Sequence, residues 1–540
     1  MSGWFWVKKR KIGRHDKMNR NYFLISLVIY YCCNGLVLAN PVPGTPGWDS
    51  GFDGERAKSH VFVLASDSLG GRYSGFIGTD KADKYITDHF RNLGLAEPFG
   101  NDGYFHNFTY GAGEYKMPSS LVVEYQDGTV DSAFMWEDFN IYKYSGFGNV
   151  IGKVVFAGYG VSAPEKGWDE YADIDVMGKI VLVTRGLPAI DTIDWNKEGS
   201  SGFKSNIAYD KGAIGFLMTL GDPPKYATIQ DEYFLEELPA MWISETLADN
   251  ILGESGKTIQ DLRKETNNNH HSVSLELNAI VTMQVSGEYY PERQTRNICG
   301  ILPGSDPELR KEVVIIGAHM DHHGIDAAGN IYPGADDNAS GAAAMMELAT
   351  VFSSNENRAK RSIMFMGFAA EEEGLVGSRK FVESLPMDGY DVVAMLNMDM
   401  VGVGSGEIGI GGLDQFPPLE GMFTGEGNGA WQDSSLDEIA FWSLHGSSDH
   451  AAFMDVGIPS YVIGARGSHP NYHTPNDTVG AIQPEVLKAV GDMMYHCALC
   501  LADNVPNLRD YSHITEQLSR KYPIAIAYTQ GSLFKNKFRQ

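Results

Sequence analysis

The stretch that decides the fold runs from Val313 to Gly341 and reads VVIIGAHMDHHGIDAAGNIYPGADDNASG. Its β-branched apolar start, Val313–Ile316, predicts a buried strand, and the turn-rich segment after His319 predicts a loop. Ser340 then opens an Ala- and Met-rich run that predicts a helix. Imidazole and carboxylate groups therefore follow directly on a strand. Because ligands in open α/β sheets bind beyond the carboxyl ends of the strands, this stretch predicts the first half of a two-metal site.

The same part of the chain contains further long apolar runs. Strands are predicted at Ile363–Phe368, Val392–Leu396 and Ser460–Ile463. Helices are predicted at Ala342–Phe352, Ser378–Leu385 and Pro484–Ala502. This alternation of strands and helices predicts an α/β protein of three layers, α/β/α, with a mostly parallel central sheet.

A chain of 540 residues is long enough for two or three domains. We expect the N-terminal part of the main domain at 40–147, an inserted β-rich domain at 148–285, the catalytic domain at 286–510 and a tail at 511–540. Short apolar strands such as Ile180–Val183 predict the insert, which carries few clustered residues of catalytic type.

Residues 1–39 have the pattern of a secretory signal peptide. A basic block precedes the apolar run Phe23–Leu38, and the small-residue end at Ala39 resembles a cleavage site. The run is short for a membrane span and contains Asn34 and Gly35. We therefore expect cleavage, no stable membrane insertion, and a secreted or periplasmic protein; Met18 is an alternative start.

The composition excludes some classes of partner. A net charge of -26 argues against nucleic acid, whose phosphates require clustered Lys and Arg. Beyond the signal segment, the sparse cysteines Cys299, Cys497 and Cys500 do not suggest a disulfide framework. We expect them to be buried free thiols.

Five side chains of the types that bind zinc lie at or just beyond the predicted strand ends: His319, Asp336, Glu372, Asp399 and His473. Zinc takes imidazole nitrogen and carboxylate oxygen, with about four donors per ion. Taken alone, each residue is weak evidence, because a single loop histidine is more often a surface residue. The five together follow four strands on one expected edge of the sheet. They suit two metal ions that share a carboxylate, and we expect Asp336 to be the shared one.

Two neighbouring acids have predicted roles beside the metals. Asp321 follows His319 by two residues, so on an extended chain both side chains face one way and Asp321 can orient the imidazole. Three adjacent acids, 371–373, follow a buried strand, and adjacent side chains diverge. We assign Glu372 to metal and Glu371 to the general base.

Two other groups of residues are not assigned roles. His322, His323 and Asp326 are not predicted to be ligands. The triplet Ser448-Asp449-His450 suggests a serine hydrolase only weakly, because adjacent residues cannot form the nucleophile–base geometry.

Five blocks of sequence carry a resemblance to a known family. They read GAHMD from Gly317, GADDNASG from Gly334, AAEEEGLVGS from Ala369, NMDM from Asn397 and YHTPNDT from Tyr472. Together they resemble the signature blocks of secreted two-zinc aminopeptidases of the aminopeptidase Y and bacterial leucyl aminopeptidase type. LASDSLGGR, 64–72, is similar to the N-terminal part of such enzymes. The GYG, GKIVLV and KGAIGFLM motifs of the insert resemble a protease-associated domain.

The resemblance implies how the ligands are shared between two zinc ions. His319 and Asp399 would hold one ion, Glu372 and His473 would hold the other, and Asp336 would bridge them. In the same comparison Glu371 is the general base and Asp321 orients His319.

The implied activity is removal of N-terminal amino acids from peptides by metal-activated water. Some family members have a Tyr near the Ser-Asp-His triplet; here His445 is the candidate donor to the oxyanion. The alternatives are a carboxypeptidase or dipeptidase on the same scaffold, in which Arg466 would bind the free carboxylate. A non-catalytic receptor-like binding protein and a glutaminyl cyclase-like transferase also remain open.

Overall fold

The computed structural model describes residues 50–503, except for 191–192, 194, 222, 225–227, 386, 388, 413–438 and 443–447. The predicted signal peptide at 1–39, the tail at 511–540 and His445 lie outside the described residues. Within the described part of the chain, no helix is both long enough and apolar enough to cross a membrane.

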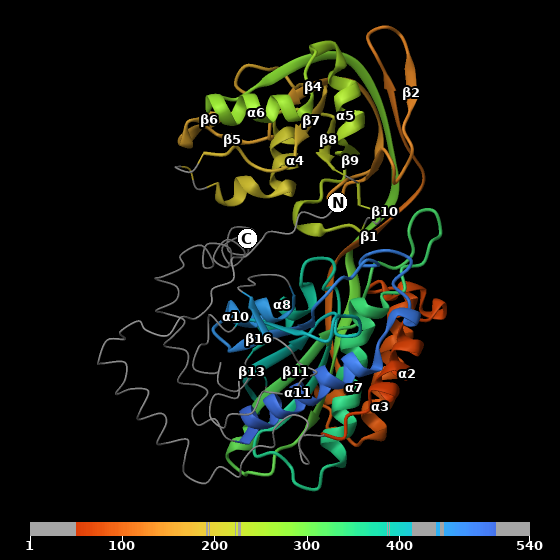
Figure 1. Cartoon of the computed structure of the whole chain (residues 1–540), viewed down its shortest axis with the longest axis vertical. Helices are drawn as coiled ribbons and strands as arrows, with labels where there is room; N and C mark the ends of the chain where they lie inside the picture. The colour runs from red at the N-terminus through yellow and green to blue at the C-terminus, as the bar shows by residue number, and fades with distance from the viewer. Residues whose placement is uncertain are drawn as a thin grey trace, which may run out of the picture.

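The described residues form two bodies joined by two long paired strands (Figure 1). These strands are β1 (Phe105–Glu124) and β10 (Ser274–Leu302), which run antiparallel from the lower body of Figure 1 into the upper one. The lower body contains the predicted catalytic domain, and the upper body contains the predicted insert.

The lower body is built on a mostly parallel sheet. Its centre is β11 (Glu312–His319), with the parallel neighbours β12 (Ser362–Phe368) and β13 (Asp391–Met398). Next to β13 lies the parallel strand β16 (Ser460–Ala465). Beyond these are the antiparallel β10 on one side and β14 (Ile408–Gly411) on the other, the latter paired with β15 (Ile439–Trp442). The four strands predicted for this domain are confirmed.

Helices cover both faces of this sheet, because each strand buries apolar side chains on both sides. Val314 and Ile316 face one core, and Val313 and Ile315 face another. The first core is covered by α2 (Gly54–Leu64), α3 (Ile77–Asn92), α7 (Ser340–Ser354) and α11 (Pro484–Asp503). The second is covered by α8 (Val376–Glu383) and α10 (His450–Met454). The predicted α/β fold is confirmed.

The upper body has its own cores. Its sheet continues from β10 through β4 (Gly148–Ala157), β7 (Ile180–Thr184), β8 (Gly215–Leu220), β9 (Ala240–Ser244) and β3 (Phe139–Ile141). Its helices are α4 (Ser201–Asp210), α5 (Glu245–Leu252) and α6 (Ile259–Asn269), and the short strands are β2 (Val130–Ser132), β5 (Ser162–Ala163) and β6 (Trp168–Asp169).

The upper body begins earlier in the chain than predicted. Tyr115, Leu121 and Ile141 already belong to its hydrophobic core, so the predicted boundary at 148 falls inside it. The reason is that β1 continues from one body into the other while paired with β10, so the sequence carries no linker at the crossing. Cys299 and Cys497 are buried and form no disulfide, as expected, whereas Cys500 is only partly buried.

Candidate metal centre

Four strand ends bring the candidate ligands to one edge of the lower sheet. His319 is the last residue of β11, Glu372 follows β12, Asp399 follows β13 and His473 follows β16. The irregular turn Ala335–Ala339, between β11 and α7, supplies a further acid. Because these four strands are parallel, their carboxyl ends meet, and side chains from distant parts of the sequence converge.

The donor atoms form two sets joined by Asp337. His319 Nε2 lies 3.3 Å from Asp337 Oδ1 and 3.4 Å from Asp399 Oδ1. His473 Nε2 lies 2.9 Å from Asp337 Oδ2 and 3.4 Å from Glu372 Oε2. Two donors about 2.1 Å from one tetrahedral zinc ion are about 3.4 Å apart. Three of the four spacings and the donor types therefore fit two zinc ions with the Asp337 carboxylate between them, while the fourth, between His473 and Asp337, is a hydrogen-bond distance.

The structure places Asp337, and not the predicted Asp336, between His319 and His473. Asp336 Oδ2 lies 2.7 Å from His469 Nδ1, and its Oδ1 accepts the N–H of Gly402 at 2.9 Å. The backbone N–H groups of Asp336 and Asp337 both donate to the carboxylate of Asp477, at 2.9 to 3.1 Å. This anchor sets the turn, and the two adjacent side chains point in different directions from it. Asp337 faces His319 and His473, whereas Asp336 faces His469.

Burial and mutual repulsion perturb the acids of this cluster. Burial, with the nearby carboxylates, raises the pKa of Glu371 well above its usual range and raises the pKa of Glu372 to about 8. Burial acts in the same direction on Asp337, but hydrogen bonds to His319 and His473 hold its pKa well below the usual range. Carboxylates packed this closely are unfavourable without a compensating cation. The cluster therefore has the electrostatics of a cation site.

Asp321 lies next to the candidate ligands and contacts His319 and the loop that carries Glu371 and Glu372. Its Oδ1 is 3.6 Å from His319 Nδ1. Its two oxygens accept the backbone N–H groups of Glu371 at 3.3 Å and of Glu372 at 3.4 Å. A fully buried acid in this place orients both His319 and the loop that carries the two glutamates.

A buried guanidinium holds the metal-site loops together. Arg72 donates to the carbonyls of Leu64, Met320, Pro333 and Gly334 at 2.6 to 2.8 Å, and its side chain is fully buried. These carbonyls belong to the N-terminal helix α2, the end of β11 and the turn before Asp336. Arg72 was not predicted from the sequence to have a role, although it is the one charged residue in the Gly-rich end of the LASDSLGGR motif.

The neighbouring residue Gly71 explains why that motif is rich in glycine. Gly71 has φ of +70°, and a Cβ there would lie 2.4 Å from the carbonyl oxygen of Gly324. Only glycine allows the N-terminal segment to approach the loop after β11 this closely. The close approach brings the Arg72 guanidinium under the metal-site loops.

The upper body contacts this edge of the sheet. Gln230, in the segment between β8 and β9, donates through Nε2 to the backbone carbonyl of Glu372 at 3.1 Å. The insert therefore reaches the loop that carries two of the predicted functional acids, Glu371 and Glu372.

Comparison with known proteins finds relatives of the lower body. Residues 297–498 match the model of Peptidase family M28. Aminopeptidase YwaD of Bacillus subtilis (strain 168) is 31% identical over 220 residues, which are 38% of this chain and 44% of that protein. A protein named "Probable leucine aminopeptidase" from Arthroderma benhamiae is 32% identical over 196 residues, 35% of this chain and 52% of that protein. The chain thus spans about half the length of the curated relatives it matches. The resemblance to aminopeptidases stated from the motifs is confirmed for this region, and the two zinc ions and secretion stay predictions.

Solved structures share the fold over most of both bodies. The aminopeptidase from Aneurinibacillus sp. strain AM-1 aligns with a TM-score of 0.62 and 23% identity, covering 85% of this chain and 97% of that one. BSAP, described as a zinc aminopeptidase from Bacillus subtilis, aligns with a TM-score of 0.56 and 20% identity, covering 84% and 96%. At these identities the comparison shows only that the fold is shared. The site of this chain is assigned from the positions of its own residues.

Proposed function

We propose that the protein is a zinc-dependent aminopeptidase that removes amino acids from peptides with a free N-terminus. The observation that carries the proposal is the pair of donor sets joined by Asp337 at the carboxyl ends of four strands. His319 and Asp399 would hold one zinc ion, and Glu372 and His473 would hold the other. The M28 match over residues 297–498 supports this reading.

The residues around the donor sets suit hydrolysis of a peptide bond. Zinc, when bound, supplies Lewis-acid chemistry that acidifies water and polarises the scissile carbonyl. Glu371 offers a carboxylate oxygen within 4.8 Å of donor atoms of His319 and Asp399. From there it would accept a proton from the attacking water and return it to the leaving amine. Asp321 positions Glu371 through the N–H group of that residue.

The charge of the site favours a substrate amine over a substrate carboxylate. Buried acids that are not assigned to metal, including Glu373 and Asp449, add to those of the donor sets. A carboxypeptidase needs a guanidinium that can bind the free carboxylate. The buried Arg72 guanidinium instead donates to four backbone carbonyls. The excess of buried acids supports the aminopeptidase over the carboxypeptidase. Arg466, the residue that would bind the free carboxylate in that alternative, directly follows β16, and its role stays a prediction.

Three further assignments belong to the proposal. We propose that residues 1–39 direct export, because a basic block followed by an apolar run is typical of a signal peptide. We propose that the upper body is a protease-associated domain, on the GYG, GKIVLV and KGAIGFLM motifs. His445 remains the predicted donor to the oxyanion.

A panel of peptides tests the proposal. The purified protein is assayed on peptides with a free amine, a blocked N-terminus and a blocked C-terminus, before and after chelation. Cleavage should require the free amine, tolerate the C-terminal block, and disappear with chelator and return with zinc. Cleavage of N-blocked peptides would contradict the assignment, and activity in excess chelator would contradict the metal.

A matched pair of variants tests the base. Glu371→Gln keeps the shape of the side chain and removes the proton acceptor, so turnover should fall by about 10²-fold or more while zinc content stays near normal. Glu383→Gln on the exposed end of α8 is the control and should behave as the unaltered protein. Retained turnover in Glu371→Gln would exclude this role.

A further inference from the structure

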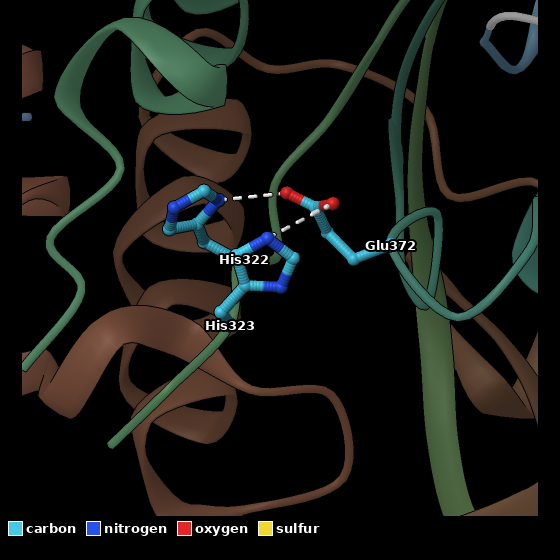
Figure 2. A group of neighbouring side chains, drawn as sticks. All are labelled: His322, His323 and Glu372. Atoms are coloured by element: carbon cyan, nitrogen blue, oxygen red, sulfur yellow. Dashed lines mark hydrogen bonds and ion pairs between the residues drawn. The ribbon is translucent and has the colours of Figure 1, made fainter. Parts of the chain in front are cut away.

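Two histidines that were not predicted to be ligands lie against the metal centre. His322 and His323 follow β11 and are both buried. Figure 2 shows that both rings point toward the carboxylate of Glu372, each facing a different oxygen. The donor atoms of the three residues all lie within 4.8 Å of one another.

The distances from His322 and His323 to Glu372 indicate two different interactions. His322 Nδ1 lies 2.7 Å from Glu372 Oε1, which is a hydrogen-bond distance and is short for two donors on one ion. His323 Nε2 lies 3.5 Å from Glu372 Oε2, which is long for a hydrogen bond but close to the ~3.4 Å between two ligands of one tetrahedral zinc ion. His322 therefore holds one oxygen of Glu372, and His323 faces the oxygen that also faces His473.

The position of His473 points to the same ion. The rings of His323 and His473 meet edge to face with their centroids 4.2 Å apart. His473 Nε2 lies 3.4 Å from Glu372 Oε2, the same oxygen that His323 approaches. Both imidazoles thus approach the same oxygen of Glu372, and Asp337 Oδ2 lies 2.9 Å from His473 Nε2.

We propose that His323 is a further ligand of the zinc ion held by Glu372 and His473, and that His322 positions the Glu372 carboxylate. This inference rests on the proposed function, because it presupposes a zinc site. With Asp337 shared, one ion has four protein donors and the other has three, His319, Asp337 and Asp399. Zinc sites with four protein ligands are typically structural, whereas catalytic sites keep an open position.

The different numbers of protein donors imply different roles for the two ions. Glu371 offers its carboxylate on the three-donor side, beside His319 and Asp399. The open position and the general base are then on the same side of the centre. The four-donor ion would hold the loops and the shared carboxylate in place, and it would be the more tightly bound of the two.

Stepwise removal of zinc tests this assignment. In the unaltered protein, titration with a chelator should remove one ion well before the other. His323→Leu should weaken the tighter ion by at least about 10-fold and bring the two affinities together, measured by competition with a chromogenic chelator. His60→Leu, which changes a histidine on α2 that contacts Tyr85, is the control and should leave both affinities unchanged.

Cobalt spectroscopy gives a readout that does not depend on activity. His323→Cys replaces one donor with a thiolate, so the cobalt-loaded variant should show a thiolate-to-cobalt charge-transfer band if position 323 is a ligand. His322→Leu should weaken the metal about 10- to 100-fold without changing the number of imidazoles on it. These spectra keep the inference testable if His323→Leu fails to fold.

The outcomes separate the inference from the proposed function. Two zinc ions in His323→Leu with unaltered affinities, and no charge-transfer band in His323→Cys, would overturn the role of His323. If the unaltered protein binds no zinc and cleaves no peptide, the proposed function itself fails.

Discussion

Arg72 allows the sharpest test of how the fold holds the metal-site loops. Arg72→Met keeps most of the side-chain volume and removes the donors to Leu64, Met320, Pro333 and Gly334. A buried carbonyl left without a donor costs about 1–3 kcal/mol, so four such carbonyls cost at least about 4 kcal/mol. Removing the buried guanidinium also removes the free-energy cost of its desolvation, and this gain offsets part of the loss from the carbonyls. We expect a net loss of about 4 kcal/mol, a large part of the ~5–15 kcal/mol of a typical domain.

The charge of Arg72 persists at neutral pH. Burial lowers its pKa to about 10, against the raising influence of the acids around Asp321. Arg72→Lys keeps a charge but has one nitrogen, which cannot reach four separated carbonyls. It should therefore lose less stability than Arg72→Met and more than the control. The control is Arg293→Met, which removes one hydrogen bond, to the carbonyl of Gly75, and the cation–π contacts with Phe76 and Tyr290 at a half-buried site.

Urea unfolding followed by circular dichroism, together with zinc content after dialysis, measures both consequences. Arg72→Met should unfold at clearly lower urea and bind zinc weakly, because three of the four carbonyls lie on segments next to His319 and Asp337. Arg293→Met should lower the unfolding free energy by about 2 kcal/mol or less, about half of the loss expected for Arg72→Met. If the unfolding free energy of Arg72→Met is within about 1 kcal/mol of that of the unaltered protein and the variant keeps its zinc, the Arg72 hydrogen bonds are not what holds these loops.

Three further predictions concern Asp337, Glu170 and Gln230. Asp337→Asn should lose both zinc ions, whereas Asp336→Asn should keep them with about 10- to 100-fold weaker affinity; metal analysis showing the reverse would restore Asp336 as the bridge. Burial raises the pKa of Glu170 to about 7 from 4.5, so the stability linked to its neutral form is complete below about pH 4.5 and is lost as the pH rises through 7. The loss is about 3 kcal/mol, and Glu170→Gln should flatten the fall of the melting temperature between pH 5 and about pH 8; an unchanged slope would contradict this. Gln230→Ala removes one hydrogen bond to the Glu372 segment, so kcat/KM should fall about five-fold at normal zinc content; unchanged kinetics would show that the contact does not affect the site.

The lower body was predictable because its strands are unambiguous. The run Val313–Ile316 is apolar on both faces, which only a strand covered by two helical layers requires. The ligand-bearing positions His319, Glu372 and Asp399 directly follow such strands, so their convergence at one edge follows from the parallel order. The start of the upper body was not predictable, because β1 crosses between the bodies as one continuous strand and no change of composition marks the crossing.

The choice between adjacent residues depends on contacts that are remote in sequence. Asp337 rather than Asp336 faces the donors because Asp477, 140 residues away, accepts the N–H groups of both. The direction of His322 likewise depends on the turn that covers it. A Cβ on Gly334, which has φ of +56°, would lie 2.5 Å from the His322 ring. The glycine at the start of GADDNASG therefore makes room for a histidine that follows β11. In the sequence this glycine indicates only a turn, and in the folded chain it allows His322 to reach Glu372.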